Sequence, residues 1–307
     1  MSKLPVVFVV SAGPERFADL IPGAAALGES VHAVYVGDAA DAAAVFGLGA
    51  SKLYTLAKQP GQIFENYAPS IADCIRKAGK TVVLLPCDKR GKAMAAKLGV
   101  ALKAAVINDV CALGDDGSVR RMVYGGLAIG EEKPASDVTI MTVGAGVFEA
   151  APVSTGSGDT EELPFVAPAV AITLKEVKPR EASSVDIGKA RRLVSVGRGF
   201  ARKEDIALAE ALARATGAEL ACSRPIAEGE HWMERERYIG VSGVMVKSDV
   251  YMAVGISGQI QHMVGARDSR VIIAVNKDKN APIFKFADYG IVGDLYKILP
   301  ALTKALG

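Results

Sequence analysis

Apolar residues along the chain fall into short runs separated by stretches with helical spacing. Residues 6–10 and 31–36 are apolar runs typical of buried strands, and residues 17–27 between them have the pattern of a helix. A strand, a helix and a second strand in this order form the unit from which parallel sheets are built. The N-terminal part of the chain is therefore predicted to begin as a βαβ unit.

The same pattern continues through the first half of the sequence. The turn at residues 114–117 between two apolar runs predicts a hairpin. Residues 155–162 are polar and contain glycine, which predicts a loop. Further strands are expected at 52–56, 81–85, 110–113, 119–124, 138–143 and 171–177, and helices at 63–78 and 93–102.

A charged, unpatterned segment divides the chain. Residues 178–188 contain Pro179 and no apolar period, so they are predicted to link an N-terminal domain, 1–180, to a C-terminal domain, 189–307. In the second domain, strands are expected at 193–196 and 219–222 around a helix at 204–216. We predict an α/β protein of two domains, each a mainly parallel sheet with flanking helices.

The stretch from 250 to 294 organises the second domain. Residues 250–256 form an apolar run without proline, suited to a strand buried on both faces, and end in the small-residue turn 255–258. Ile260, Met263 and Val264 then give a helix its apolar stripe. A second strand is expected at 270–275, and Asp294 should open the last helix. A strand, a tight turn and a helix N-terminus present free N–H groups to an anion.

Polar side chains gather where these strands should end. Ser257 to His262 follow one strand, Asn276 follows the next, and Asp294 follows later. Open α/β sheets bind ligands at the carboxyl ends of their strands, so these residues are candidates for a binding site. A glycine-serine turn by itself is also explained by steric need, and His262 by a structural role at a helix end.

Composition narrows the class of protein. The 307 residues are half apolar, which predicts ordinary folded cores, and 36 basic against 34 acidic residues give a charge of +2. This near-balance of charge does not indicate the strongly basic surface that is typical of nucleic-acid-binding proteins. The four cysteines lie far apart with no metal-ligand spacing, so we expect reduced thiols, no metal and a cytoplasmic protein. Neither a signal peptide nor a membrane-spanning segment is predicted.

The sequence also contains residues that could serve two other kinds of chemistry. The turn from Cys87 to Lys92 precedes a helix and could hold a phosphate, but it lacks the glycine spacing of a Walker loop, and a loop that touches a partner chain explains it equally. His262 could act as a catalytic base, yet no nucleophile stands in a recognisable relation to it, so no catalytic residues are assigned.

The string VGISGQIQHMVGA, continuing through AVNKDKNAPIFKFADYGIVGDL, closely resembles the C-terminal FAD domain of the electron transfer flavoprotein α subunit. The resemblance covers residues 190–307 well. The segments ERYIGVSG and IVGDLYKILPAL are most similar to the branch of this family tied to carnitine, nitrogen-fixation and related anaerobic acyl-CoA systems. The resemblance implies a Rossmann-like, DHS-like FAD-binding fold for residues 189–307. For the N-terminal domain it implies a pseudo-symmetric partner of the β subunit, without a nucleotide of its own.

The resemblance also implies roles for particular side chains. Arg198 contacts FAD, and the pair Ser223 and Arg224 lies against the flavin. Ser242 takes the place of the hydroxyl at flavin N5, while Val241 stands where the family usually has another residue. We further expect His262 to stabilise negative charge on the flavin N1–C2=O edge. The complete predicted cofactor-binding set is Arg198, Ser223, Arg224, Ile239, Gly240, Val241, Ser242, Ser257, Gly258, Gln259, Ile260, Gln261, His262, Asn276, Asp294 and Leu295.

The function that the resemblance implies is electron carriage rather than stand-alone catalysis. The expected assembly is a heterodimer with an electron transfer flavoprotein β subunit. It would carry electrons between flavin dehydrogenases of the acyl-CoA type and a quinone oxidoreductase or ferredoxin-type acceptor. The alternative is a nucleotide-binding sensor or adaptor without redox function.

Overall fold

The structure is a computed structural model that describes residues 3–114, 116–144, 146–148, 155–177 and 186–307. The chain divides into two compact units, Met1–Val123 with Ile129–Lys178, and Tyr124–Ala128 with Pro179–Gly307. Most of the predicted linker, residues 178–185, lies outside the described residues.

The first unit contains a nine-stranded sheet with the order β7-β6-β5-β8-β4-β1-β2-β3-β9. Pairing is parallel from β5 through β8, β4, β1, β2 and β3 to β9, and β5 pairs with β6 antiparallel. The strands are β1 (Leu4–Ser11), β2 (Gly28–Val36), β3 (Lys52–Leu56), β4 (Thr81–Pro86), β5 (Ala105–Leu113), β6 (Val119–Val123), β7 (Ala128–Glu132), β8 (Val138–Val143) and β9 (Asp159–Glu162).

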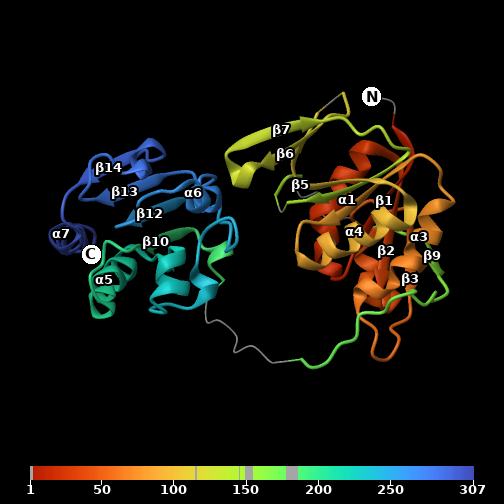
Figure 1. Cartoon of the computed structure of the whole chain (residues 1–307), viewed down its shortest axis with the longest axis horizontal. Coiled ribbons are helices and arrows are strands. Elements are labelled where there is room, and N and C mark those ends of the chain that lie inside the picture. The colour runs from red at the N-terminus through yellow and green to blue at the C-terminus, as the bar shows by residue number, and fades with distance from the viewer. Residues whose placement is uncertain (1–2, 115, 145, 149–154, 178–185) are drawn as a thin grey trace. The chain divides into compact units, whose positions relative to one another are not determined.

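Helices cover both faces of this sheet (Figure 1). Helices α1 (Phe17–Leu27) and α2 (Ala39–Ala42) contribute to one apolar cluster, and α3 (Ala68–Arg76) and α4 (Lys89–Leu102) to the other. Because the central strands are buried from both sides, they are apolar almost without interruption. Short 3₁₀ turns occur at Pro14–Arg16, Ala43–Val45, Phe64–Tyr67 and Tyr124–Gly126.

The second unit contains a five-stranded, entirely parallel sheet with the order β11-β10-β12-β13-β14. Helices α5 and α7 pack on one face through one apolar cluster, and α6 packs on the other face (Figure 1). The strands are β10 (Arg192–Val196), β11 (Glu219–Cys222), β12 (Val250–Val254), β13 (Ile272–Asn276) and β14 (Tyr289–Val292); the helices are α5 (Ile206–Thr216), α6 (Ile260–Ala266) and α7 (Leu295–Leu306). Short helical turns lie at Ile187–Lys189, Lys203–Asp205, Pro225–Gly229, Arg235–Arg237 and Pro282–Lys285. The predicted class, α/β with two mainly parallel sheets and flanking helices, is confirmed.

Some predicted elements are wrong. The polar stretch predicted as a loop at 155–162 contains strand β9, and the strand predicted at 171–177 is absent. The Asn66 side chain explains the second error, because its amide donates to the Ile172 carbonyl and accepts from the Ile172 N–H, each at 2.9 Å. Both backbone groups that a neighbouring strand would bind are thus already satisfied.

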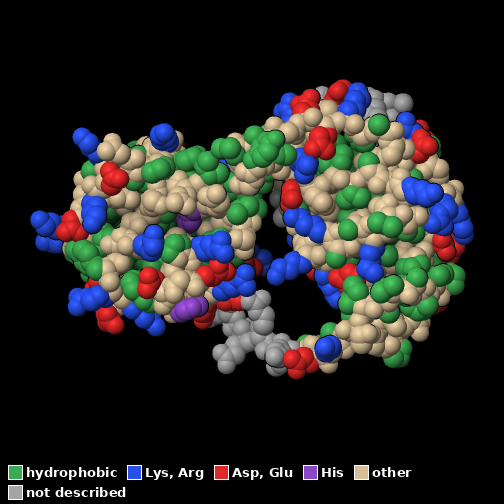
Figure 2. Space-filling view, in the orientation of Figure 1, with side chains coloured by type: hydrophobic (Ala, Val, Ile, Leu, Met, Phe, Trp, Pro, Cys, Tyr) green, Lys and Arg blue, Asp and Glu red, His purple; other side chains and the backbone are tan. Residues whose placement is uncertain are grey.

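The surface is mixed in charge. On the face seen in Figure 2, basic and acidic side chains of the described residues are interspersed over both units. Within the described ranges, no helix has the length and apolar character needed to cross a membrane.

Candidate functional site

The strand order of the second unit creates a ligand-binding crevice. The chain runs from β10 outward to β11 on one side and then returns to β12 on the other, so the connections leave the carboxyl ends of β10 and β12 in opposite directions. In doubly wound sheets of this order, ligands bind at this switch point, outside the carboxyl ends of the strands. Here Arg198 follows β10 and Ser257 follows β12.

A cavity of about 470 Å³ lies at this place, within the volume range of roughly 300–1,000 Å³ common for small-molecule sites. It collects side chains from the loops after β10, β11 and β12. The lining residues are Arg198, Ser223, Arg224, Pro225, Tyr238, Val241, Ser242, Gly255, Ile256, Ser257, Gln259, Gln261 and His262. Much of the set predicted from the sequence is therefore brought together.

Two glycines constrain the loop after β12, and one of them, Gly255, lines the cavity. Gly255 has φ +63° and lies against Gly199, whose N–H donates to the Gly255 carbonyl at 2.9 Å. Gly258 has φ +80°, and a Cβ there would meet the Ile283 Cα at 2.3 Å. Both positions need the left-handed backbone and the missing side chain of glycine. These constraints hold the loop after β12 close to its neighbours.

The turn from Ile239 to Gly243 forms another wall. The Ile239 N–H donates to the Cys222 carbonyl at 2.9 Å, and the Val241 N–H donates to the Gln261 carbonyl at 2.8 Å. Ser242 is exposed, and its hydroxyl oxygen lies 3.1 Å from the phenol oxygen of Tyr238. The turn is thereby tied both to β11 and to α6, with the Ser242 side chain at the cavity.

An arginine cluster stands beside the cavity. Arg224 binds Glu228 at 2.7 Å, and Arg235 binds the other oxygen of the same carboxylate at 3.1 Å. The hydrogen bond from Arg224 lowers the pKa of Glu228, which therefore stays ionised. Arg198, from the loop after β10, is exposed in the same cavity. Two cationic side chains and several N–H and hydroxyl donors suit an anionic ligand.

His262 is the buried titratable group of the cavity. It is 8% exposed, and its Nε2 lies 2.6 Å from the Tyr251 hydroxyl. Burial lowers the pKa of His262 to about 4, against a smaller opposing influence of the Ile239 backbone. Its Nδ1 is buried and has no hydrogen-bond partner among the described residues. The ring is therefore neutral at pH 7, so any hydrogen bond that it offers a ligand comes from a neutral imidazole.

Other predicted residues lie outside the cavity lining. Asn276 donates its side-chain amide to the Ile256 carbonyl at 2.9 Å and so joins two loops. Asp294 caps α7 by accepting from the Tyr296 N–H at 3.0 Å, and Leu295 is a core residue. Ile239, Gly240, Gly258 and Ile260 flank the lining residues in sequence without lining the cavity themselves. Ligand contacts by these residues stay predictions.

The sequence reading missed several residues of the site. Pro225 and Tyr238 line the cavity, and Tyr251 lies beneath it against His262. A usable signal existed for Tyr251, because it is the one hydroxyl-bearing side chain in the otherwise aliphatic strand β12. Tyr238 comes four residues before Ser242 across a tight turn, a spacing that no sequence pattern marked.

A larger, more open hollow of about 700 Å³ lies beside α5 and contains none of the predicted site residues. Its lining is rich in charged side chains of both signs, including Lys203, Glu210, Arg214 and Arg237. It lacks the strand ends and small-residue turns that distinguish the cavity at the switch point.

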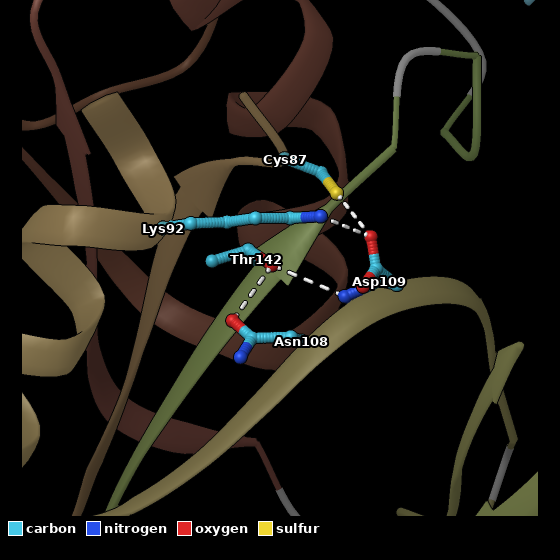
Figure 3. A network of polar contacts seen from close by, with 5 residues as sticks. All are labelled: Cys87, Lys92, Asn108, Asp109 and Thr142. Atoms are coloured by element: carbon cyan, nitrogen blue, oxygen red, sulfur yellow. Dashed lines mark hydrogen bonds and ion pairs between the residues drawn. The ribbon is translucent and has the colours of Figure 1, made fainter. Parts of the chain in front are cut away.

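The side chains at the two ends of the turn from Cys87 to Lys92 in the first unit are engaged by Asp109 on β5 (Figure 3). Asp88 accepts from the Gly91 N–H at 2.8 Å and caps α4, while Lys92 and the Cys87 thiol both reach Asp109, at 2.6 and 2.9 Å. Thr142 accepts from the Asp109 N–H at 3.1 Å and donates to Asn108 at 3.2 Å. The cap and the lysine that a phosphate would need are thus already engaged.

The fold and the cavity define a two-unit α/β protein with a cavity suited to an anionic ligand at the switch point of its second sheet. Two family models match the chain, the electron transfer flavoprotein domain over residues 18–168 and the electron transfer flavoprotein FAD-binding domain over residues 186–267. "Protein FixB" from Escherichia coli O7:K1 is 53% identical over 312 residues, covering 100% of this chain and 99% of that protein. "Protein FixB" from Shigella flexneri matches with the same identity and coverage. The chain belongs to the electron transfer flavoprotein α-subunit family.

The cofactor follows from this membership. The second matched segment is the family's FAD-binding domain, so FAD is the cofactor of the second unit. The residues present fit such a group: the cavity combines two arginines, hydroxyl donors and a buried imidazole nitrogen without a partner among the described residues. Arg198, Ser223, Arg224, Ser242, Ser257 and His262 all fall within the matched segment.

Proposed function

We propose that this chain is the FAD-binding subunit of a heterodimeric electron carrier. In this role it passes electrons from flavin dehydrogenases of the acyl-CoA type to a quinone oxidoreductase or a ferredoxin-type acceptor, or in the reverse direction. The observation that carries the proposal is the cavity at the β10/β12 switch point, inside the family's FAD-binding segment. FAD supplies the redox chemistry when bound, because it can take up and release electrons one or two at a time.

The side chains of the cavity have distinct tasks in this proposal. Arg198 and Arg224 provide positive charge for the anionic parts of the cofactor. Ser242 offers a hydroxyl to flavin N5, and His262 offers a neutral N–H to the pyrimidine edge of the ring. None of these groups takes part in bond making, so the protein holds the cofactor and sets its potential.

The partner in this proposal is an electron transfer flavoprotein β subunit. The first unit supports it, because it has complete apolar cores on both faces of its sheet while its polar turn at Cys87–Lys92 is engaged by Asp88 and Asp109. A folded α/β unit whose one candidate phosphate turn is occupied by its own carboxylates is consistent with a role in contact with another chain. The first unit is accordingly assigned to partnership and the second to the cofactor.

The experiment is reconstitution with an electron transfer flavoprotein β subunit. The co-expressed complex should be yellow, bleach with dithionite, and be reduced anaerobically by an acyl-CoA dehydrogenase and its substrate. A control complex that carries Arg198→Ala and Arg224→Ala should retain less FAD. Binding of FAD without reduction by any flavin dehydrogenase would instead identify a nucleotide-binding sensor or adaptor.

Dependence on the partner is tested separately. The chain expressed alone should lose FAD on dilution faster than the co-expressed complex, as measured by absorbance after desalting and by analytical ultracentrifugation. A stable monomer with stoichiometric FAD would disprove the requirement for a β subunit while leaving the cofactor assignment intact.

A further inference from the structure

A buried hydrogen bond beneath the cavity joins Tyr251 on β12 to His262 on α6. The phenol oxygen lies 2.6 Å from Nε2, Tyr251 is fully buried, and His262 is 8% exposed. Which atom carries the shared proton decides the chemistry of the cavity. A neutral imidazole holds one proton, and the nitrogen that accepts from Tyr251 leaves the other nitrogen as the donor.

The surroundings of Tyr251 favour donation from its phenol. Burial raises the pKa of Tyr251, so the phenol keeps its proton inside the core. The buried Ser195 hydroxyl on the neighbouring strand β10 has no hydrogen-bond partner among the described residues, whereas the phenol oxygen lies within hydrogen-bond distance of His262 Nε2. A buried phenol proton without an acceptor costs free energy, so the phenol should donate it. His262 Nε2 is the acceptor within reach.

The surroundings of His262 favour the same direction. The Ile239 backbone acts on the imidazole in the sense that raises the pKa of His262, as an acceptor does. The Ile239 N–H is already donated to the Cys222 carbonyl, so the carbonyl oxygen is what Ile239 can offer the ring. Nδ1 is buried and lacks a hydrogen bond among the described residues. A protonated Nδ1 is a donor and is therefore compatible with the Ile239 carbonyl as its neighbour. An unprotonated Nδ1 is an acceptor, and it would place two acceptors against each other.

We propose that Tyr251 is a positioning residue that fixes His262 as the neutral tautomer with its proton on Nδ1. The Tyr251 phenol donates to Nε2, and the Nδ1–H group of His262, a residue that lines the cavity, is left free to donate. In this arrangement His262 supplies a preset N–H dipole rather than a titrating charge. The tautomer is a property of the chain itself; its effect on the flavin rests on the proposed function.

The tautomer is tested by nitrogen NMR of the complex with its β subunit, labelled with ¹⁵N-histidine and freed of flavin. His262 is assigned by comparison with His262→Gln. The expected wild-type spectrum shows a protonated Nδ1 and an unprotonated Nε2. Protonation on Nε2 would overturn the proposal, because Tyr251 would then be the acceptor. This NMR measurement does not depend on whether a Tyr251 variant folds. Its result bears on the tautomer of His262 and not on whether the protein carries electrons.

Variants test whether Tyr251 is responsible. Tyr251→Phe should lower the ratio of the Nδ1–H to the Nε2–H form by roughly 2- to 12-fold, the factor expected for one neutral hydrogen bond. Tyr289→Phe, a matched loss of a hydroxyl at an exposed position on β14, should leave it unchanged. An unaltered ratio in folded Tyr251→Phe, checked by circular dichroism, would assign the tautomer to the Ile239 carbonyl alone.

Discussion

The hydroxyls of Ser242 and Tyr238 share one hydrogen bond, with 3.1 Å between their oxygens. Two hydroxyl groups carry two protons, and their mutual bond uses one of them. When Tyr238, which is buried, donates to Ser242, the serine proton is left for a group in the cavity. Either hydroxyl can be the donor of this bond, and donation from Tyr238 is the direction that leaves Ser242 as a donor toward the cavity.

Loss of this donor should lower the flavin potential. We expect Ser242→Ala to shift a one-electron midpoint down by about 20–65 mV, since a neutral hydrogen bond contributes roughly 0.5–1.5 kcal/mol and about 59 mV corresponds to a tenfold change. Ser242→Thr keeps the hydroxyl and is the matched control, with little change. Spectroelectrochemical titration of the complex measures both. An unchanged midpoint in Ser242→Ala would mean that the turn is only structural.

Gly258→Ala should destabilise the second unit. The left-handed backbone costs a non-glycine residue on the order of 1–3 kcal/mol, and the new Cβ would also meet Ile283 backbone atoms. Urea unfolding should show a loss of at least about 2 kcal/mol. Gly229→Ala is the control, because no heavy atom lies within 4 Å of its Cβ position and its φ is not positive; it should change stability by less than about 0.5 kcal/mol. Equal stability of the two variants would contradict the packing described.

His262 should make the flavin-free protein less stable in mild acid. Its pKa falls from an ordinary 6.5 to about 4 on folding, so below pH 6.5 the unfolded chain binds a proton that the folded chain does not. The free energy of unfolding should drop by up to about 1.4 kcal/mol per pH unit between these values. His262→Gln lacks this dependence, and comparing the two by urea unfolding at pH 5 and pH 7 cancels the other titrating groups. Parallel pH profiles would show that His262 titrates normally.

Cys87 should react slowly with iodoacetamide at pH 7. Burial, followed by the hydrogen bond to Asp109, raises the pKa of its thiol, and the thiolate is the reactive form. Asp109→Asn removes the carboxylate and leaves Lys92 nearby, so alkylation of Cys87 should become severalfold faster. Mass spectrometry of the peptides reports it, with the partly exposed Cys111 as the internal reference. A slower reaction in Asp109→Asn would show that Lys92 does not act on the thiol.

Strongly periodic segments were predictable from the sequence. The helix expected at 17–27 is α1 despite Pro22, and the strands expected at 52–56 and 138–143 are β3 and β8. Strand β9 has no apolar pattern to find, because all four of its residues are exposed. The run at 171–177 has the apolar pattern of a strand but forms none. The side chain of Asn66 already binds the backbone N–H and carbonyl of Ile172. Pairing depends on partners that are distant in sequence.

The candidate site was predictable as a set of loops but not as a geometry. Ser257 to His262 were found because small and polar residues follow an apolar run, and the family resemblance added Arg198, Arg224 and Ser242. The pairing of Tyr238 with Ser242, and of Tyr251 with His262, was not visible. The Tyr251 hydroxyl stands out in an aliphatic strand, but the sequence does not show which residue it bonds, because only packing gives it a partner.

The pairing of β10 with β12 also bears on the order of events during synthesis. Val196 pairs with Val254, and the intervening chain must leave the ribosome before the two strands can meet. The first wall of the cavity, with Arg198, therefore exists as nascent chain well before the second wall, with His262. Closing so long a loop costs entropy that is regained only when β12 docks. The cofactor can enter only a chain that has been made almost to its end, which separates flavin loading from the earlier folding of the first unit.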